Sequence, residues 1–270
     1  MEFITIRQLA TIEEFHEFER VERAIWGMPD VEVIPTHVLL TVAKNGGLVL
    51  GAFDGGDMVG VLCGFLGRDT LGWKHCSHVM GVLAEQRGRG IGSALKWAQR
   101  EAVLGQGLDR VTWTYDPLGT PNARLNLHAL GAVCRRYLPD LYGPLADELN
   151  AGLPTDRFEV DWWLATPEVE ARRDGRHPIP EALPAPANRV ALYEGTPWPR
   201  PEAWDIPVER DISVAIPGNF AALRRADPAL ALAWRLHTRE AFTALFAAGY
   251  VAYDFVVEAD GRCARYLLRK

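Results

Sequence analysis

A glycine-rich run in the first third of the chain has the composition of an anion-binding turn. It reads Arg87-Gly88-Arg89-Gly90-Ile91-Gly92, after an apolar stretch that ends at Val82-Leu83 and before a helical pattern at residues 93–104. Glycine permits positive φ and lets a ligand come close to the main chain. Unpaired N–H groups at a helix N-terminus favour an anion. With two arginines beside it, the turn is predicted to bind a pyrophosphate.

Two familiar nucleotide-binding loops do not fit this run. A dinucleotide fingerprint requires Gly-x-Gly-x-x-Gly/Ala, but Gly88 and Gly90 are followed by Ser93 at the third position. A Walker A loop requires Gly-x-x-x-x-Gly-Lys-Ser/Thr, which this run does not contain. The ligand is therefore expected to be a phosphate compound of another class.

The elements that position the turn follow from periodicity and from stop signals. Thr11 and Glu14 form a capping box that starts a helix ending at Gly27. Asp54-Gly55-Gly56-Asp57 predicts a hairpin between two apolar strands. Interleaved helices and strands of this size predict an α/β or α+β sheet domain. Helices are expected at 12–25, 36–44, 93–104 and 122–130, and strands at 4–9, 48–53, 58–66, 75–83, 110–115 and 158–164.

A change of composition follows this domain. Residues 166–207 hold nine of the 18 prolines, which predicts a long, mostly extended connector. Residues 208–270 then read as strand, long helix, strand and strand, with Asp227-Pro228 as the helix start. We therefore expect a domain at 1–165, a connector at 166–207 and a small subdomain at 208–270. The subdomain is expected to pack on the first domain or on a partner subunit.

Arg87-x-x-Gly90-x-Gly92, set between a strand and a helix, resembles the acyl-CoA motif of the GNAT superfamily of N-acyltransferases. The resemblance covers about residues 1–165. It implies a mixed central sheet flanked by helices, here with a proline-rich connector and a small αβ C-terminal extension. It further implies that an acyl-CoA is the co-substrate and that its pyrophosphate binds main-chain N–H groups of Arg87, Gly88, Arg89, Gly90 and Gly92. Val82 and Leu83 would contact the pantetheine arm, one of their N–H groups would polarise the thioester carbonyl, and Asn122 would contact the coenzyme.

A narrower resemblance concerns the donor and the acceptor. The chain is similar to a bacterial subgroup of predicted acetyltransferases linked to N-succinylation of amino acids alongside a racemase. The residues that carry it are Asp116-Pro117-Leu118, Asn122-Ala123, Asn126, Leu130-Gly131-Ala132, Tyr142-Gly143 and Leu153-Pro154-Thr155-Asp156-Arg157. The subgroup implies acetyl-CoA or succinyl-CoA as donor and the primary amine of a small molecule, such as an amino acid, as acceptor.

Candidate catalytic residues follow from the chemistry of amide formation, which needs a neutral amine, a stabilised oxyanion and a proton for the leaving thiolate. Many GNAT-like proteins carry a Tyr three residues before the Leu-Gly pair, but this chain has Leu127 there. Tyr142 and Tyr137 are the nearest substitutes, with Tyr142 preferred. His78 is a candidate base because its pKa lies near neutrality. Asn126 would orient the acceptor or the thioester, or would be an ordinary polar residue of a helix face.

Two charged residues are candidates for substrate binding, each with a structural alternative. Asp116 ends a strand where side chains can line the central cleft, although Asp-Pro is also a plain turn signal. Arg157 could bind a carboxylate of an amino acid or a succinyl group, or could pair with Asp156.

Composition excludes other classes of function. The net charge of −6 and the lack of a basic block argue against a nucleic-acid partner. The sequence shows no signal peptide and no apolar run of about 18 residues, so we expect a cytoplasmic protein with no membrane partner. The four cysteines are scattered, and no metal is expected. A homodimer through the C-terminal region is one expected assembly. The alternatives are a non-catalytic acyl-CoA-binding module and a protein N-acetyltransferase.

Overall fold

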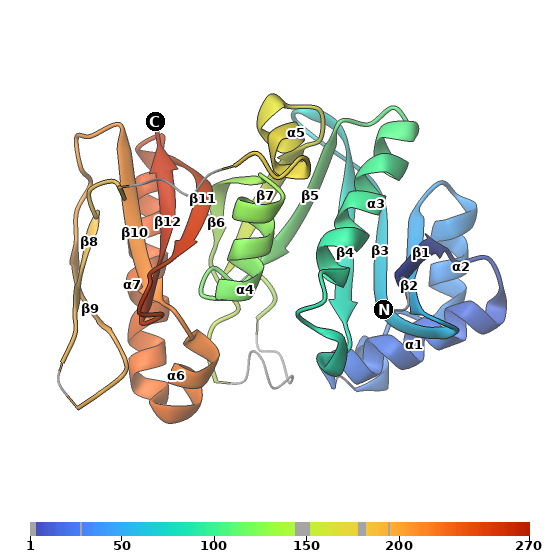
Figure 1. Ribbon diagram of the computed structural model, residues 1–270, viewed down its shortest axis with the longest axis horizontal. Helices are drawn as coiled ribbons and strands as arrows, with labels where there is room; N and C mark the ends of the chain where they lie inside the picture. The colour runs from blue at the N-terminus through green and yellow to red at the C-terminus, as the bar shows by residue number, and fades with distance from the viewer. Residues whose placement is uncertain (1–3, 28, 144–151, 178–181, 194) are drawn as a thin grey trace. The chain divides into compact units, whose positions relative to one another are not determined.

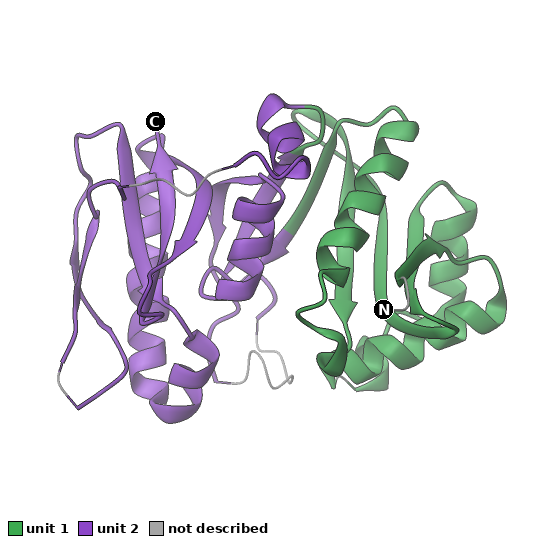
Figure 2. Ribbon diagram, viewed as in Figure 1, with its two compact units in different colours: residues 1–113, 146–148, 163–165 green, residues 114–145, 149–162, 166–270 purple. Residues whose placement is uncertain are grey.

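The computed structural model describes residues 4–27, 29–143, 152–177, 182–193 and 195–270. The chain forms two compact units, shown in Figure 2. Unit 1 runs to Trp113 and includes Trp163–Ala165, and unit 2 holds the other described residues from Thr114 onward. The division therefore lies inside the predicted first domain, and the predicted subdomain 208–270 shares unit 2 with residues of that domain.

The sheet of unit 1 is mixed, as predicted. Its strands are antiparallel neighbours from β1 to β4, while β4 and β5 run parallel. The hairpin at residues 54–57 joins β2 to β3, which confirms the turn signal. The strands are β1 Ile4–Gln8, β2 Leu48–Asp54, β3 Asp57–Asp69, β4 Gly72–Val82 and β5 Arg110–Tyr115, which continues into unit 2.

Helices cover both faces of this sheet (Figure 1). Alternate residues of a strand point to opposite faces. On β2, Val49 and Phe53 therefore pack with helices α1, Ile12–Trp26, and α2, Thr36–Lys44. Leu48 and Leu50 pack on the opposite side with helix α3, Ile91–Gly105. The start of α1 has the predicted capping box, and Gly27 ends the helix in a left-handed conformation at φ 61°.

The sheet of unit 2 is built from the second part of the chain. Its strand order is β7-β6-β11-β12-β10, and its paired strands are antiparallel. The predicted strands and long helix of the C-terminal region are confirmed. Strands β10, β11 and β12 span Asp211–Pro217, Val251–Val257 and Cys263–Arg269, and helices α6 and α7 span Phe220–Ala226 and Pro228–Ala247.

Strand β6, Val133–Leu138, is absent from the predicted elements because a β-bulge breaks its alternation. Its pairing with β7, Arg157–Trp163, shifts register between Cys134 and Arg136. A bulge lets two consecutive residues face the same way. Arg135 and Arg136 are therefore both exposed, while Cys134 and Tyr137 are buried.

Two further segments differ from their predicted form. The predicted helix at 122–130 is a short α-helix, α4 at Thr120–Ala123, followed by a π-helix at Arg124–Ala129. The proline-rich segment is not only extended. It contains helix α5, Pro167–Arg173, and a two-stranded hairpin of β8, Asn188–Ala191, and β9, Arg200–Trp204. The remaining short elements are 3-10 helices at Asp30–Glu32 and Ala84–Gln86.

An aromatic core joins the C-terminal elements of unit 2 to β6 and β7. The Phe158 ring meets the rings of Tyr115, Phe242 and Tyr266 edge to face at centroid distances of 5.8, 4.8 and 5.2 Å. Such contacts add to the free energy gained from burial alone. Helix α7 and strand β12 are therefore part of the core of unit 2 rather than an appendage to it.

Candidate functional site

The glycine run forms the predicted strand-to-helix turn. Gly88 and Gly90 have φ of 81° and 79°, a region that other residues rarely adopt. A Cβ at either position would meet nothing within 4 Å, so backbone conformation and not crowding requires glycine. Gly90 is the N-cap of α3, and no side chain caps the helix. The first N–H groups of this 15-residue helix, including that of Gly92, are therefore left for another acceptor.

Positive charge surrounds this helix start. The first turn of α3 has no acidic residue, and Arg87 and Arg89 are exposed beside it. Arg87 Nε donates to the carbonyl of Val82 over 3.2 Å. Arg89 is held by the carboxylate of Asp54, at 2.5 Å, and by Gln86. The turn combines unpaired donors, a helix dipole and two guanidinium groups, which fits a pyrophosphate.

The main-chain N–H groups of Val82 and Leu83, at the end of β4, point in different directions. The N–H of Leu83 donates to Val59 O of β3 over 3.0 Å. Sheet pairing already uses the Leu83 N–H, so the alternative in which this group polarises a thioester stays a prediction that the hydrogen bond does not support. In an antiparallel pair, the next residue directs its N–H to the opposite side. Val82 therefore points its N–H away from β3 and is the better donor.

Among the described residues, the parallel pairs between β4 and β5 lie in the first half of β4. The parallel pairing with β5 joins His75 to Val111 and Cys76 to Thr112, near the start of β5. A bulge between β3 and β4 leaves His78 without an opposite residue, because Cys63 pairs with Val79 and the next residue with Ser77. The ring of His78 is exposed and lies 5.8 Å from that of Phe65. Desolvation lowers its pKa, so a neutral imidazole is available near pH 7.

A buried polar cluster under α3 was not anticipated from the sequence. Lys96 Nζ donates to Ser77 Oγ over 3.2 Å and to Gln99 Oε1 over 2.8 Å, and lies 3.4 Å from the centroid of Trp113. Burial lowers the pKa of Lys96. The residues Lys96, Gln99 and Arg100 are all buried and recur at helical spacing, a signal that the sequence contained.

His75 of β4 makes unit 1 sensitive to acid. Its ring is fully buried and neither nitrogen has a hydrogen-bond partner. Burial, helped by the charge of Lys96, lowers the pKa of His75 to about 4. The unfolded chain binds the proton near pH 6.5, so stability is complete above that pH and is lost as pH falls toward 4. We expect unfolding at pH 5 to cost about 2 kcal/mol less than at pH 7 through this residue.

The measurement is denaturant unfolding of the wild type and of His75→Gln at both pH values. The contribution of His75 to the pH dependence of the free energy of unfolding is the difference between the two proteins. The contributions of the other titrating groups cancel in this difference because both proteins contain them. Parallel curves for the two proteins between pH 5 and 7 would contradict the assignment.

Tyr142 and Arg157, two of the predicted site residues, come together with Thr114 in unit 2. Tyr142 is about half exposed, and its hydroxyl forms a 2.8 Å hydrogen bond with Thr114 Oγ1. The guanidinium of Arg157 lies 5.3 Å from the centroid of the Tyr142 ring. Thr114 is the residue that the sequence analysis missed, and its place two residues before the predicted Asp116 was the available signal. This group combines a phenol, a hydroxyl and a cation.

Two arginines of α7 occupy the nearby carboxylates. Asp116 binds Arg235 through two hydrogen bonds of 2.7 and 2.6 Å and accepts from the N–H of Leu118. Asp156 binds Arg239 through bonds of 3.0 and 2.6 Å. Arg157 donates to the main-chain oxygen of Asp156 and not to its carboxylate in the bond that the structure gives. Asp116 thus has a structural partner, and its role in substrate binding stays a prediction that these contacts do not support.

The remaining candidates lie on α4 and the π-helix. Asn122 is exposed in the first turn of α4, as a coenzyme contact would need. Asn126 is 4% exposed inside the π-helix, which favours the structural alternative for this residue. Leu127 is fully buried in the core. The position at which the resemblance leads one to expect a proton-donating Tyr is therefore closed to solvent here.

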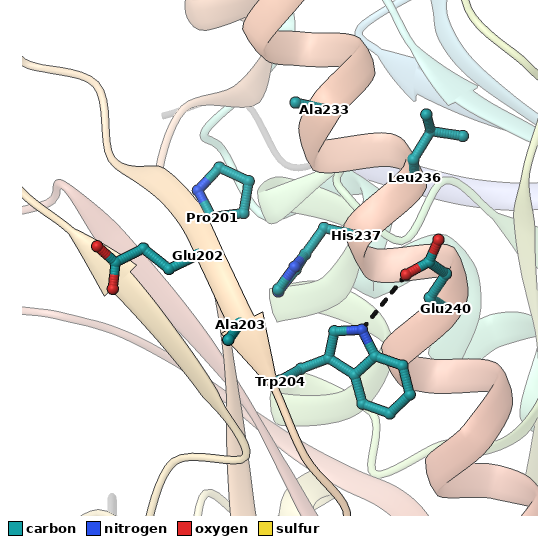
Figure 3. A pocket seen from close by; sticks show the side chains of 8 residues that line it. All are labelled: Pro201, Glu202, Ala203, Trp204, Ala233, Leu236, His237 and Glu240. Carbon is teal, nitrogen blue, oxygen red and sulfur yellow. Dashed lines mark hydrogen bonds between the residues drawn. The ribbon is translucent and has the colours of Figure 1, made fainter.

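A separate hollow of about 500 Å³ lies between β9 and α7 (Figure 3). Trp204 and Glu240 face each other across it with a 3.5 Å contact between Nε1 and Oε2. It contains none of the predicted site residues.

Within the described ranges, no helix has the length and apolar character to span a membrane. The same residues include no group of three or more His, Cys, Asp or Glu placed to hold a metal ion.

The sequence pattern of the acetyltransferase (GNAT) family matches residues 10–131. This segment contains α1, the whole glycine turn and the strand β5. Residues 10–131, which are less than half of the 270 residues, are thus similar in sequence to the acetyltransferase (GNAT) family. A search of curated protein sequences gives no match.

Several solved structures are similar to part of this chain. A GNAT-family acetyltransferase from Streptococcus pneumoniae is 14% identical, with a TM-score of 0.47 over 59% of this chain and 98% of its own. The ribosomal-protein-S18-alanine N-acetyltransferase from Escherichia coli is 13% identical, with a TM-score of 0.48 over 61% and 96%. YncA, an acetyltransferase from Salmonella typhimurium with its cofactor acetyl-CoA, is 18% identical, with a TM-score of 0.47 over 67% and 99%.

Proposed function

We propose that this protein transfers an acetyl or succinyl group from coenzyme A to the primary amine of a small molecule, such as an amino acid. The observation that carries the proposal is the uncapped start of α3 behind Gly88 and Gly90, within the matched segment. The pyrophosphate binds main-chain N–H groups there, with Arg87 and Arg89 balancing its charge.

Transfer is direct in this proposal. The amine nitrogen attacks the thioester carbon, the C–N bond forms, and the C–S bond breaks. Val82 N–H, which points away from β3, donates to the developing oxyanion. A base accepts the amine proton, for which His78 of unit 1 is proposed, and an acid protonates the thiolate, for which Tyr142 of unit 2 is the candidate from the sequence. The exposed ring of His78 with its lowered pKa and the half-exposed phenol of Tyr142 support these roles.

Arg157 is proposed to bind a carboxylate, which would select an amino acid as acceptor or succinyl-CoA as donor. Guanidinium matches carboxylate geometry, and Arg157 lies against the ring of Tyr142. An acceptor carboxylate at Arg157 would place the amine near the phenol. A protein amine as acceptor is the second candidate within the same chemistry.

The test is release of free thiol from acetyl-CoA and from succinyl-CoA, with and without a panel of L- and D-amino acids. We expect acceptor-dependent release with one donor. Arg87→Ala should raise the KM for that donor about tenfold, the loss of one charge-assisted hydrogen bond. Arg68→Ala, which removes another exposed arginine of unit 1, is the matched control and should leave the KM unchanged.

The buried Leu127 gives a specific reason to consider a non-catalytic acyl-CoA-binding module. That function predicts acyl-CoA binding, weakened in Arg87→Ala, with no thiol release from any acceptor. Absence of both binding and release would contradict the proposed site itself.

A further inference from the structure

The C-terminal helix α7 reaches the residues around Tyr142 through a chain of hydrogen bonds. Arg239 lies on α7, 83 residues after Asp156, and forms with it an ion pair with contacts of 3.0 and 2.6 Å. The Asp156 side chain is completely buried, while that of Arg239 is 29% exposed. Asp156 directly precedes β7, whose first residue is Arg157.

Two further groups, besides Arg239, donate hydrogen bonds to the Asp156 carboxylate. The hydroxyl of Tyr137 donates to Oδ2 over 2.7 Å, and the main-chain N–H of Asp140 donates to Oδ1 over 3.0 Å. Burial would raise the pKa of Asp156, but the hydrogen bonds from Arg239 and Tyr137 lower it overall. The carboxylate is therefore ionised and able to fix the turn after β6.

That turn has an unusual backbone. Asp140 has a φ of 47°, and it is the one non-glycine residue with positive φ among those the structure describes. Such a conformation costs on the order of 1 kcal/mol and persists where neighbouring contacts hold it. Asp140 Oδ1 accepts from the N–H of Thr155 over 3.0 Å, which closes the connection to Asp156.

Thr155 connects the Asp140 turn to Tyr142 through hydrogen bonds. The main-chain N–H of Tyr142 donates to Thr155 Oγ1 over 3.0 Å, and Leu141 N–H donates to Thr155 O over 3.1 Å. The backbone of Tyr142 is thus set by residues that Asp156 holds. The side chain of Tyr142 then meets Thr114 and Arg157.

We infer that Arg239 is a positioning residue for the acceptor side of the site, and that it acts through Asp156 on the Asp140 turn and on Tyr142. The inference rests on the proposed function for its catalytic consequence. It gives the C-terminal region a part in the reaction beyond completing the core. The geometry itself, however, can be tested without any reaction.

The first arm measures hydrogen exchange at the Tyr142 amide in wild type, Arg239→Ala and Arg239→Lys. We expect at least tenfold faster exchange in Arg239→Ala and partial recovery in Arg239→Lys, which keeps the charge but not the two-point contact. Arg265→Ala is the matched control, because Arg265 of the same C-terminal segment also forms an ion pair, with Glu258, and its side chain is 22% exposed against 29% for Arg239. Unchanged exchange at Tyr142 in Arg239→Ala would overturn the inference.

The second arm uses the amine and donor that give thiol release with wild type. Arg239→Ala should raise the KM for the amine on the order of tenfold, with the KM for acyl-CoA within twofold of wild type. Equal rises in both constants would indicate general damage and overturn the specific role. If wild type released no thiol with any amine, the proposed function would fail, while the exchange arm would still decide the positioning role.

Discussion

Gly90→Val is expected to weaken binding of acetyl-CoA on the order of 100-fold. Gly90 sits at φ 79°, where a β-branched residue is strongly disfavoured, and it is the N-cap of α3. A valine would rotate the turn toward negative φ and move the first N–H groups of the helix. Loss of two charge-assisted hydrogen bonds, each about 1.5 kcal/mol, gives this factor. Isothermal titration calorimetry with acetyl-CoA measures it.

A control at the other end of the same helix separates binding from backbone strain. Gly107 has a φ of 76° and, like Gly90, no atom within 4 Å of a built Cβ. Gly107→Val should lower the free energy of unfolding of unit 1 as much as Gly90→Val does. It should leave the affinity for acetyl-CoA unchanged. Equal loss of affinity in both variants would show that the effect is strain and not the anion site.

Phe158→Ala is expected to lower the free energy of unfolding by about 3–5 kcal/mol, the usual cost for a large buried aromatic. Phe158 is fully buried at the start of β7 and contacts rings from β5, α7 and β12. Its removal would open a cavity bounded on several sides by rigid rings, which cannot collapse to fill it. In calorimetry, the unfolding transition that includes unit 2 should fall by about 10 °C.

Tyr193→Ala is the surface comparison for this core substitution. Tyr193 belongs to unit 2 and is 53% exposed, so its loss should change stability by less than about 0.5 kcal/mol. A loss below about 1 kcal/mol in Phe158→Ala would contradict a core shared between β7 and the C-terminal elements.

Local signals in the sequence predicted the parts of the fold that depend on local chemistry. The capping box at Thr11 and Glu14, the hairpin at residues 54–57 and the glycine turn all have the predicted form. In each case, residues within a few positions of one another determine the conformation. The conformation of the turn before α3 was predictable for the same reason.

Features that depend on distant partners were not predictable in this way. Strand β6 was missed because its bulge exposes Arg135 and Arg136 in succession. The partner of Asp116 is Arg235, 119 residues later, and nothing near Asp116 indicates it. The π-helix at Arg124–Ala129, in place of part of the predicted helix, was likewise not predicted.

The residues proposed for the acceptor side show both what a local sequence pattern predicts and what it misses. Tyr142 and Arg157 were candidates from the sequence, and the structure places the Arg157 guanidinium 5.3 Å from the centroid of the Tyr142 ring, while their roles stay predictions. Thr114 and Arg239, which complete the arrangement, come from a strand and a helix far away in the sequence. Pairwise contacts of this kind arise only after the chain has folded, so local patterns in a single sequence do not reveal them.

The central claim is that the main chain of residues 87–92 binds the pyrophosphate of an acyl-CoA. Amide resonances of Gly88, Gly90 and Gly92, followed by ¹H–¹⁵N correlation spectra during titration with acetyl-CoA, test it most directly. The account predicts saturable downfield shifts at these amides, as new hydrogen bonds to phosphate oxygens form. Saturation of other resonances, with these three amides unchanged, would place the coenzyme elsewhere and contradict the account.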